Sequence, residues 1–218
     1  MASNTTYANN ISTYIDTAWE SKYISKGRTF LSDGIYKAEI GAEYNGFSTL
    51  LWFGTWHNYR EYNLGLNYQT QFAQNWKIKF GYLGLKMRDA ETRLYGNEAD
   101  VAISYHKLSW LVPKVHTYYD MKSKGYFIQL SVDGHWQLTD KWSIHPRIQQ
   151  GFDHGFTSKH FDGLQHAEIR SELRYKVSNQ LTIKGFVAHS WALTDMKRTN
   201  PATAKDQTYG GLKFSYNF

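Results

Sequence analysis

The 218-residue sequence contains no cysteine, only three prolines, and no apolar run near the length of a membrane helix. Without cysteine there is no disulfide framework, no Cys-ligated zinc or iron–sulfur site, and no thiol nucleophile. A membrane helix needs about 20 consecutive apolar residues, so helical membrane proteins are excluded as well. Hydrophobic residues make up 41% of the chain and are spread evenly. That content also excludes a disordered protein.

Charge of one sign is not concentrated anywhere in the chain. The 25 basic and 19 acidic residues give a formal net charge of +6, but no basic arm or stripe is present. We therefore expect no nucleic-acid partner. The opening residues Met1 to Asn4 show neither the basic nor the apolar part of a targeting signal. The sequence is thus expected to be either cytoplasmic or an exported protein whose signal peptide has been removed.

Apolar and polar residues alternate along most of the chain. In segment 212–218 the even positions are Leu, Phe, Tyr and Phe, whereas the odd positions are Lys, Ser and Asn. Segment 167–177 shows the same period, with charged residues at every even position. Windows such as 89–100 lack the spacing of an amphipathic helix. Because a period of two is typical of strands, we predict an all-β protein.

Turn signals divide the chain into about twelve strands, an even number, although 10 or 14 strands remain open. Short turns are expected at 45–46, 73–75, 139–141 and 178–180, and longer polar loops at 26–33, 89–98, 154–163 and 195–206. Short turns at one end and longer loops at the other are typical of outer-membrane barrels. The strands are expected at 11–25, 34–44, 47–58, 60–72, 76–88, 98–109, 113–123, 126–138, 142–153, 164–177, 181–194 and 207–218.

The predicted fold is a closed antiparallel transmembrane β-barrel in the bacterial outer membrane. It is expected to form one domain over residues 1–218, with residues 1–10 as a flexible N-terminal extension, and to contact outer-membrane lipid and lipopolysaccharide. A soluble barrel or sandwich also alternates, but it would need bulky aromatic residues at nearly every inward position.

Aromatic residues are expected to form girdles at the two membrane interfaces, with aliphatic residues between them. The girdle beside the short turns comprises Tyr44, Phe47, Phe72, Trp76, Trp136, Trp142, Tyr175 and Phe218. The girdle beside the loops comprises Tyr23, Tyr82, Tyr119, Tyr126, Phe152, Trp191 and Tyr209. The aliphatic positions between them are Ile40, Leu64, Leu66, Ile103, Leu130, Ile148, Ile183 and Val187.

The last strand, with Leu212, Phe214, Tyr216 and Phe218, resembles the C-terminal signature of Gram-negative outer-membrane barrels. The resemblance implies that the assembly machinery recognises Phe218. Segments 21–28, 47–56, 151–155 and 189–191 resemble the uncharacterised TorF or Gcw_chp type of outer-membrane protein, which implies a fold and a location but no activity. By size and strand count the chain is also similar to the twelve-stranded oligogalacturonate and sialic-acid porins.

The polar face of the strands is expected to line the lumen. Its bases and acids interleave, which leaves two interpretations open: the bases of the last four strands form a positive ladder for anions, or the charges neutralise one another across strands. The pore-lining candidates are Lys77, Lys79, Arg147, Arg170, Arg174, Lys176, Lys184, Lys213, Glu168 and Glu172.

Histidine is the residue that most invites a metal or catalytic interpretation. His154, His160 and His166 surround one expected loop with Asp153 and Asp162, but their spacing matches no ligand motif. We therefore expect no metal and no cofactor.

A hydrolase triad is suggested by one sequence neighbourhood. His189, Ser190 and Asp195 are close in sequence, but adjacent strand residues point to opposite faces. Other pairs across strands, such as Ser131 with His145, are not singled out by the sequence. We predict no catalytic residues.

The predicted function is a passive channel for small hydrophilic, anionic solutes. Two alternatives remain: an outer-membrane enzyme of the lipid- or ester-hydrolase type, and a closed-lumen barrel with a structural or surface-interaction role.

Overall fold

The computed structural model describes residues 11–157, 159–160, 162–199 and 205–218, and the expected extension 1–10 lies outside them. No helix in these ranges has the length and apolarity to span a membrane. The described residues form twelve long strands: β1 (Ser12–Glu20), β4 (Ile35–Tyr44), β5 (Phe47–Trp56), β6 (Tyr59–Ala73), β7 (Trp76–Arg88), β8 (Arg93–Tyr105), β9 (Leu111–Asp120), β10 (Gly125–Gly134), β12 (Trp142–His154), β13 (Asp162–Lys176), β14 (Leu181–Ala192) and β15 (Gln207–Asn217). The shorter elements are β2 (Tyr23–Ser25), β3 (Arg28–Leu31), β11 (Trp136–Gln137) and α1 (Thr194–Thr199).

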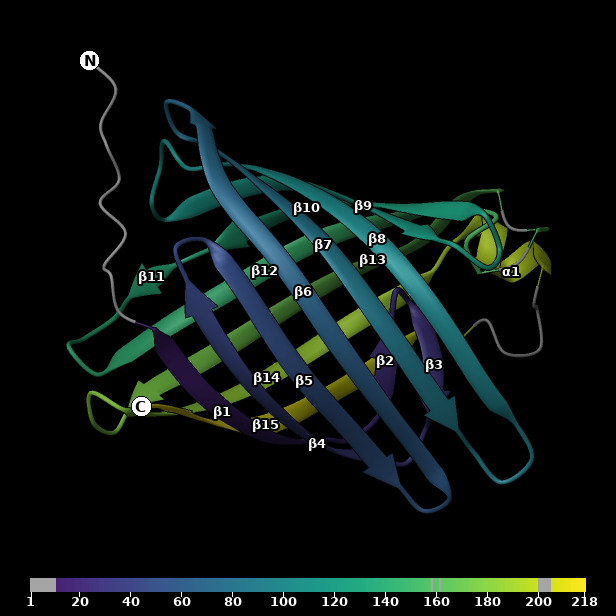
Figure 1. Cartoon of the computed structure of the whole chain (residues 1–218), viewed down its shortest axis with the longest axis horizontal. Helices are drawn as coiled ribbons and strands as arrows, with labels where there is room; N and C mark the ends of the chain where they lie inside the picture. Colours follow the sequence, from purple (N-terminus) through teal and green to yellow (C-terminus); the bar gives the residue numbers. More distant parts are fainter. Residues whose placement is uncertain (1–10, 158, 161, 200–204) are drawn as a thin grey trace.

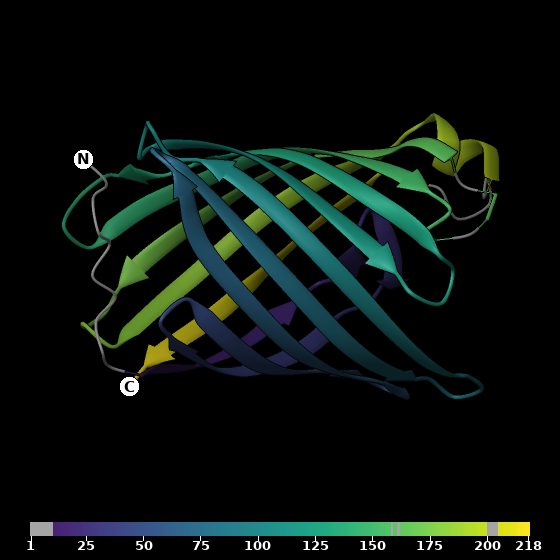
Figure 2. The same ribbon diagram turned by 45° about the horizontal axis from the view of Figure 1, so that its top comes forward.

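The long strands form one closed antiparallel barrel (Figures 1 and 2). Neighbours in sequence are neighbours in the sheet, and the pairing of β1 with β15 joins the two ends of the chain. The exception is β10, which pairs with β12, whereas the short strand β11 between them in sequence pairs only with the start of β12. The predicted all-β closed barrel is confirmed.

The two ends of the barrel differ in their connections. At one end, which we call the short-turn end, left-handed residues such as Asn45, Gly46 and Asn75 allow tight reversals. The C-terminus lies at this end (Figure 1). At the opposite end, the loop end, lie the β1–β4, β12–β13 and β14–β15 connections, the last of which contains α1. In outer-membrane barrels the short turns face the periplasm and the longer loops face outward.

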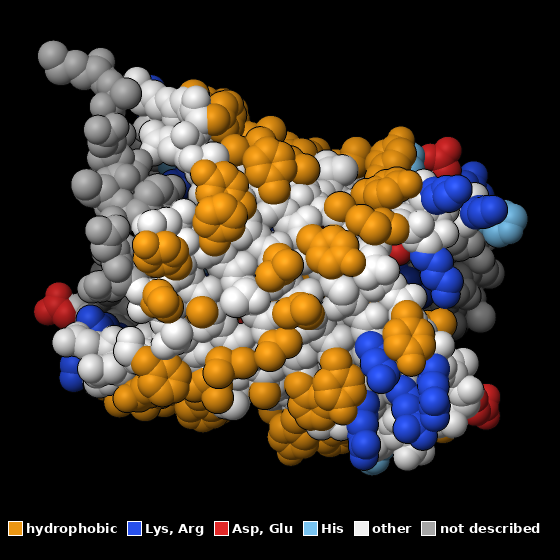
Figure 3. Space-filling view, in the orientation of Figure 1, with side chains coloured by type: hydrophobic (Ala, Val, Ile, Leu, Met, Phe, Trp, Pro, Cys, Tyr) orange, Lys and Arg blue, Asp and Glu red, His pale blue; other side chains and the backbone are white. Residues whose placement is uncertain are grey.

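The outer wall is apolar, as predicted. Ile40, Leu66 and Ile148 expose 51%, 51% and 63% of their surface, and hydrophobic side chains spread over the barrel wall (Figure 3). Three residues of the expected loop-end girdle do not belong to it. Tyr23 and Tyr209 are buried inside the barrel, and Tyr82 lies at the middle of β7, directly opposite Leu66. Tyr209 has the same parity as the inward Lys213, and Tyr23 is not part of the wall.

Two expected segment boundaries are wrong. The loop expected at 89–98 is only a short reversal, because β8 begins at Arg93 and pairs with β7 up to Arg88. Asp89 Oδ1 closes this reversal by accepting the backbone N–H groups of Glu91 and Thr92 at 2.9 and 2.7 Å. The strand expected at 11–25 leaves the wall at Glu20, and its last residues form β2.

Candidate functional site

The lumen contains a hairpin formed by β2 and β3, which we call the lumen hairpin (residues 23–31). It lies inside the barrel (Figures 1 and 2). Tyr23 packs on Trp52 and Tyr59 of the wall, with ring centroids 6.0 Å apart in both cases. Ile35, which is 0% exposed, belongs to the same cluster. This apolar contact holds the hairpin against β4–β6.

The tip of the lumen hairpin reaches the opposite wall. Lys26 Nζ lies 2.8 Å from Glu98 Oε2 on β8 and 4.5 Å from the Tyr118 ring centroid on β9. A Cβ on Gly27 would lie 2.5 Å from Cγ of His166 on β13. Since β9 is six strands from β1 in either direction around the barrel, the hairpin crosses the bore.

The part of the lumen hairpin that crosses the bore carries two basic residues. Besides Lys26, the hairpin carries Arg28, whose guanidinium lies 5.1 Å from the Phe30 ring centroid. Burial lowers the pKa of Arg28 below its usual value, and the nearby carboxylate of Asp153 opposes this shift. An arginine keeps its charge at neutral pH in proteins. The narrowed part of the lumen therefore places two bases, Lys26 and Arg28, against two acids, Glu98 and Asp153.

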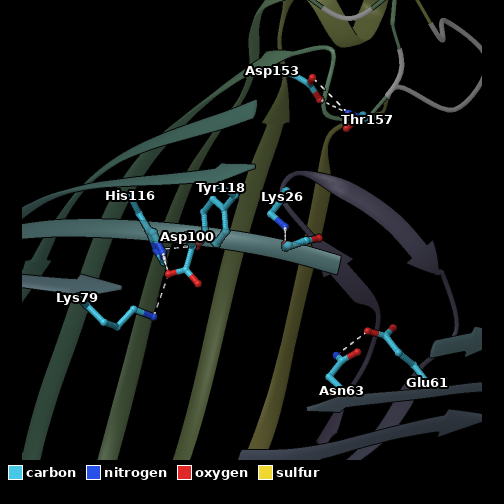
Figure 4. Close-up of polar contacts among 10 residues, drawn as sticks. Lys26, Glu61, Asn63, Lys79, Asp100, His116, Tyr118, Asp153 and Thr157 are labelled. Carbon is cyan, nitrogen blue, oxygen red and sulfur yellow. Dashed lines mark hydrogen bonds and ion pairs between the residues drawn. The ribbon is translucent and has the colours of Figure 1, made fainter. Parts of the chain in front are cut away.

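The β12–β13 connection is built against the hairpin tip. Asp153 accepts the backbone N–H group of Phe156 at 2.9 Å and that of Thr157 at 3.3 Å, the second of which Figure 4 shows. The Phe156 ring centroid lies 4.3 Å from Lys26 Nζ. His166 stacks on Phe127 at a centroid distance of 6.0 Å. These contacts fix the wall that receives the tip.

The loop histidines do not converge. His154 Nδ1 lies 2.6 Å from Asp162 Oδ1, whereas His166 Nδ1 lies 2.9 Å from Gln165 Oε1. In the described ranges, no three His, Cys, Asp or Glu side chains gather in a group that could hold a metal ion.

A polar network neutralises the wall formed by β7, β8 and β9 (Figure 4). Asp100 Oδ1 lies 3.2 Å from Lys79 Nζ and 2.6 Å from His116 Nε2. His116 Nδ1 in turn lies 2.8 Å from the Tyr118 hydroxyl. Lys79, one of the pore-lining candidates, is thus ion-paired.

Most of the other basic candidates are also paired with acids. Arg170 and Arg174 flank Glu172 at 3.4 and 2.6 Å. Arg147 pairs with Asp133, and Lys213 pairs with Asp16. Glu168 accepts a hydrogen bond from the Tyr209 hydroxyl at 2.7 Å. Among the described residues, no ion pair is formed by the three remaining candidates, Lys77, Lys176 and Lys184.

Two neighbouring cavities occupy the lumen, one at the short-turn end and one in the middle of the barrel. Their volumes are about 480 and 250 Å³, and they share Asp16, Arg174 and Lys184. Together they are lined by seven bases and five acids, a net formal charge of +2 from 7 − 5. The bases are Lys37, Lys141, Arg170, Arg174, Lys176, Lys184 and Lys213, and the acids are Asp16, Glu20, Glu39, Asp140 and Glu172.

Sequence reasoning missed the contribution of the lumen hairpin. Lys26 and Arg28 were expected at a loop, not in the bore. The sequence signal for a hairpin was Gly27 between two short segments of strand-forming residues. In the structure, Lys26 and Gly27 form the reversal with left-handed φ values of 48° and 73°.

The serine and histidine pairs do not form a catalytic group. His189 Nδ1 lies 2.7 Å from Thr208 Oγ1 on the outer face, whereas Ser190 is 3% exposed on the inner face. The predicted opposite facing of this pair is confirmed. Ser131 lies opposite Gln149, and His145 instead lies 2.8 Å from Ser143 Oγ.

A closed barrel with an apolar outer belt and a polar interior defines the class of bacterial outer-membrane β-barrels. Solved structures that the chain resembles include twelve-stranded porins of this class. One is the KdgM porin in complex with disordered oligogalacturonate, with a TM-score of 0.64, 12% identity, and coverage of 95% of this chain and 99% of that one. Another is the NanC porin, with a TM-score of 0.61, 10% identity, and coverage of 94% and 98%.

LpxR from Salmonella typhimurium, a hydrolase, is also similar, with a TM-score of 0.57, 8% identity, and coverage of 94% and 99%. At these identities the similarity concerns the fold. No family model and no curated protein matches the chain. Membership of the TorF or Gcw_chp type therefore stays a prediction.

Proposed function

We propose that the protein is a porin-like channel for the passive diffusion of small hydrophilic solutes, with a preference for anions. The observation that carries the proposal is the pair of polar lumen cavities, which seven bases and five acids line. Barrels of more than about eight strands have interior space beyond what side chains fill. The fold shared with the KdgM and NanC porins supports the same function.

The lumen hairpin sets the width of this channel. A solute that enters from the loop end must pass Lys26 and Arg28 before it reaches the cavities. Because the tip is held by one ion pair and two ring contacts, the hairpin narrows the bore at a fixed place. We infer a small pore whose anion preference comes from the excess of bases in the two cavities.

Single-channel recording in a planar lipid bilayer tests the proposal. We expect small, stable conductance steps from the purified protein, and larger steps when residues 22–32 are replaced by a short Gly-Ser linker. Absence of conductance from both proteins would contradict a channel and would favour a closed-lumen structural barrel.

The hydrolase alternative rests on the fold shared with LpxR. Serine–histidine contacts in the described residues include Ser143–His145 and Ser104–His106, each at 2.8 Å near the short-turn end. His145 lies 2.7 Å from another histidine, His135, on its other ring nitrogen, where a triad needs a carboxylate. The geometry therefore favours the channel.

We also propose that Phe218 is the signal read by the barrel-assembly machinery. Its side chain is 75% exposed, and its backbone N–H donates to the Thr13 carbonyl at 3.0 Å. The backbone of the last residue is thus held in the sheet while the ring stays accessible to a partner.

A further inference from the structure

A row of arginines crosses the outer face of the barrel at the loop end. Arg60 of β6 lies directly opposite Arg88 of β7, and Arg88 lies directly opposite Arg93 of β8. Lys86, one outward position closer to the middle of the barrel, extends the row. All four side chains are exposed. A cluster of basic side chains is visible at the loop end over these strands (Figure 3).

This basic row has no counter-charge within the described part of the protein. No carboxylate there lies within ion-pair distance of any of the four bases. Glu61 and Glu98, on the same strands, face the lumen, and Asp89 Oδ1 is engaged in the β7–β8 reversal. Like charges directly opposite on neighbouring strands are destabilising, so an anion from outside would relieve this row.

An apolar groove begins at the basic row and runs toward the middle of the outer wall. Its volume is about 710 Å³, and its lining includes Tyr62, Leu64, Lys86 and Tyr95. Gly84 leaves its floor open, because a Cβ at Gly84 would meet only Asn97 Oδ1 at 3.8 Å. Lys86 Nζ lies 5.7 Å from the Tyr95 ring centroid, so the base and the groove are continuous.

We propose that the basic row and the groove together bind one phosphorylated, multiply acylated lipid of the outer leaflet, namely lipopolysaccharide. Arginine forks match phosphate oxygens, and tyrosines favour the level of lipid headgroups. An acyl chain fits an apolar groove that faces the membrane core. The loop end of the barrel faces outward, where this lipid resides. The site lies on the outside of the wall, so the inference does not depend on conduction through the lumen.

Binding of purified diphosphorylated lipid A to the detergent-solubilised protein, followed by native mass spectrometry, tests the proposal. We expect a one-to-one adduct with the parent protein and weaker binding of the dephosphorylated lipid. Arg60→Gln with Arg88→Gln should weaken the adduct by at least about tenfold, or about 1.4 kcal/mol, because each variant removes a charge-assisted contact to phosphate. Gly84→Leu should weaken it as well, although it leaves every charge in place.

The matched control is Lys107→Gln with Lys122→Gln, which removes two exposed bases outside the row and should leave the adduct unchanged. Equal loss in this control would show nonspecific charge attraction and overturn the proposal. Equal binding of the dephosphorylated lipid, or full displacement by inorganic phosphate at millimolar concentration, would overturn it too. Unchanged binding in Gly84→Leu would remove the groove from the site.

Discussion

At the scale of the residue, the side chain's parity along a strand decides which solvent it meets. Leu66 lies at the centre of β6 and is 51% exposed on the outer wall. Asn67, the next residue, faces the lumen, where its Oδ1 accepts a hydrogen bond from Lys79 Nζ at 3.3 Å. The two positions differ by one residue but lie on opposite sides of the wall.

This difference predicts opposite outcomes for the same substitution. Leu66→Arg should destabilise the membrane-inserted barrel by about 2–4 kcal/mol, the cost of an arginine on the lipid face near the membrane midplane. Asn67→Arg should be tolerated, because its side chain meets water and Asp100. Tryptophan fluorescence during urea unfolding from lipid vesicles measures both effects. Equal destabilisation would show that the register of β6 is wrong.

At the scale of the element, the lumen hairpin is the part of the chain whose place was not predicted. The period of two continues from β1 into β2, so alternation alone does not show that the chain leaves the wall at Glu20. That departure is decided by tertiary contacts: the packing of Tyr23 on Trp52 and the ion pair of Lys26 with Glu98. Such contacts join residues far apart in the sequence.

The contacts of the hairpin tip predict a variant with a wider pore. Lys26→Met should release the tip from Glu98, and Gly27→Val should displace it from His166 and strain a backbone with φ of +73°. Single-channel conductance should rise in both variants. Lys122→Met, which neutralises an exposed lysine of the β9–β10 turn, serves as the control. Conductance equal to that of the parent in both tip variants would contradict a hairpin constriction.

The rest of the barrel was predictable because alternation is a local signal. Wherever a strand crosses the membrane, lipid requires an apolar residue at every outward position, and the sequence records this requirement directly. The alternation is not visible at residues 93–97, because the polar residues Arg93 and Asn97 occupy outward positions at the loop end. The start of β8 was therefore predicted as a loop. Ion pairs within the lumen were left open, because acids and bases interleave on the polar face and alternation does not show which of them meet across strands.

At the scale of the whole molecule, selectivity depends on the sum of the lumen charges. Single pairs such as Lys213 with Asp16 nearly cancel at a distance. The cavities nevertheless keep an excess of bases, whereas Lys26 and Arg28 of the lumen hairpin face Glu98 and Asp153. This arrangement resembles neither a continuous positive ladder nor a fully neutral interior. Anions should therefore be favoured modestly, by a long-range field that salt weakens.

We expect the reversal potential in a salt gradient to indicate anion preference at low salt. The preference should fade near 1 M, where the Debye length is roughly 3 Å. Arg170→Gln with Arg174→Gln should shift the reversal potential toward cations, because Glu172 would then stand unpaired in the cavity wall. The control is Arg60→Gln with Arg93→Gln, which removes two charges from the outer face and should shift it less. Cation preference in the parent protein, or an unchanged reversal potential in the Arg170 and Arg174 variant, would contradict a role in selectivity. Arg170 and Arg174 would then have only a structural role, as ion-pair partners of Glu172.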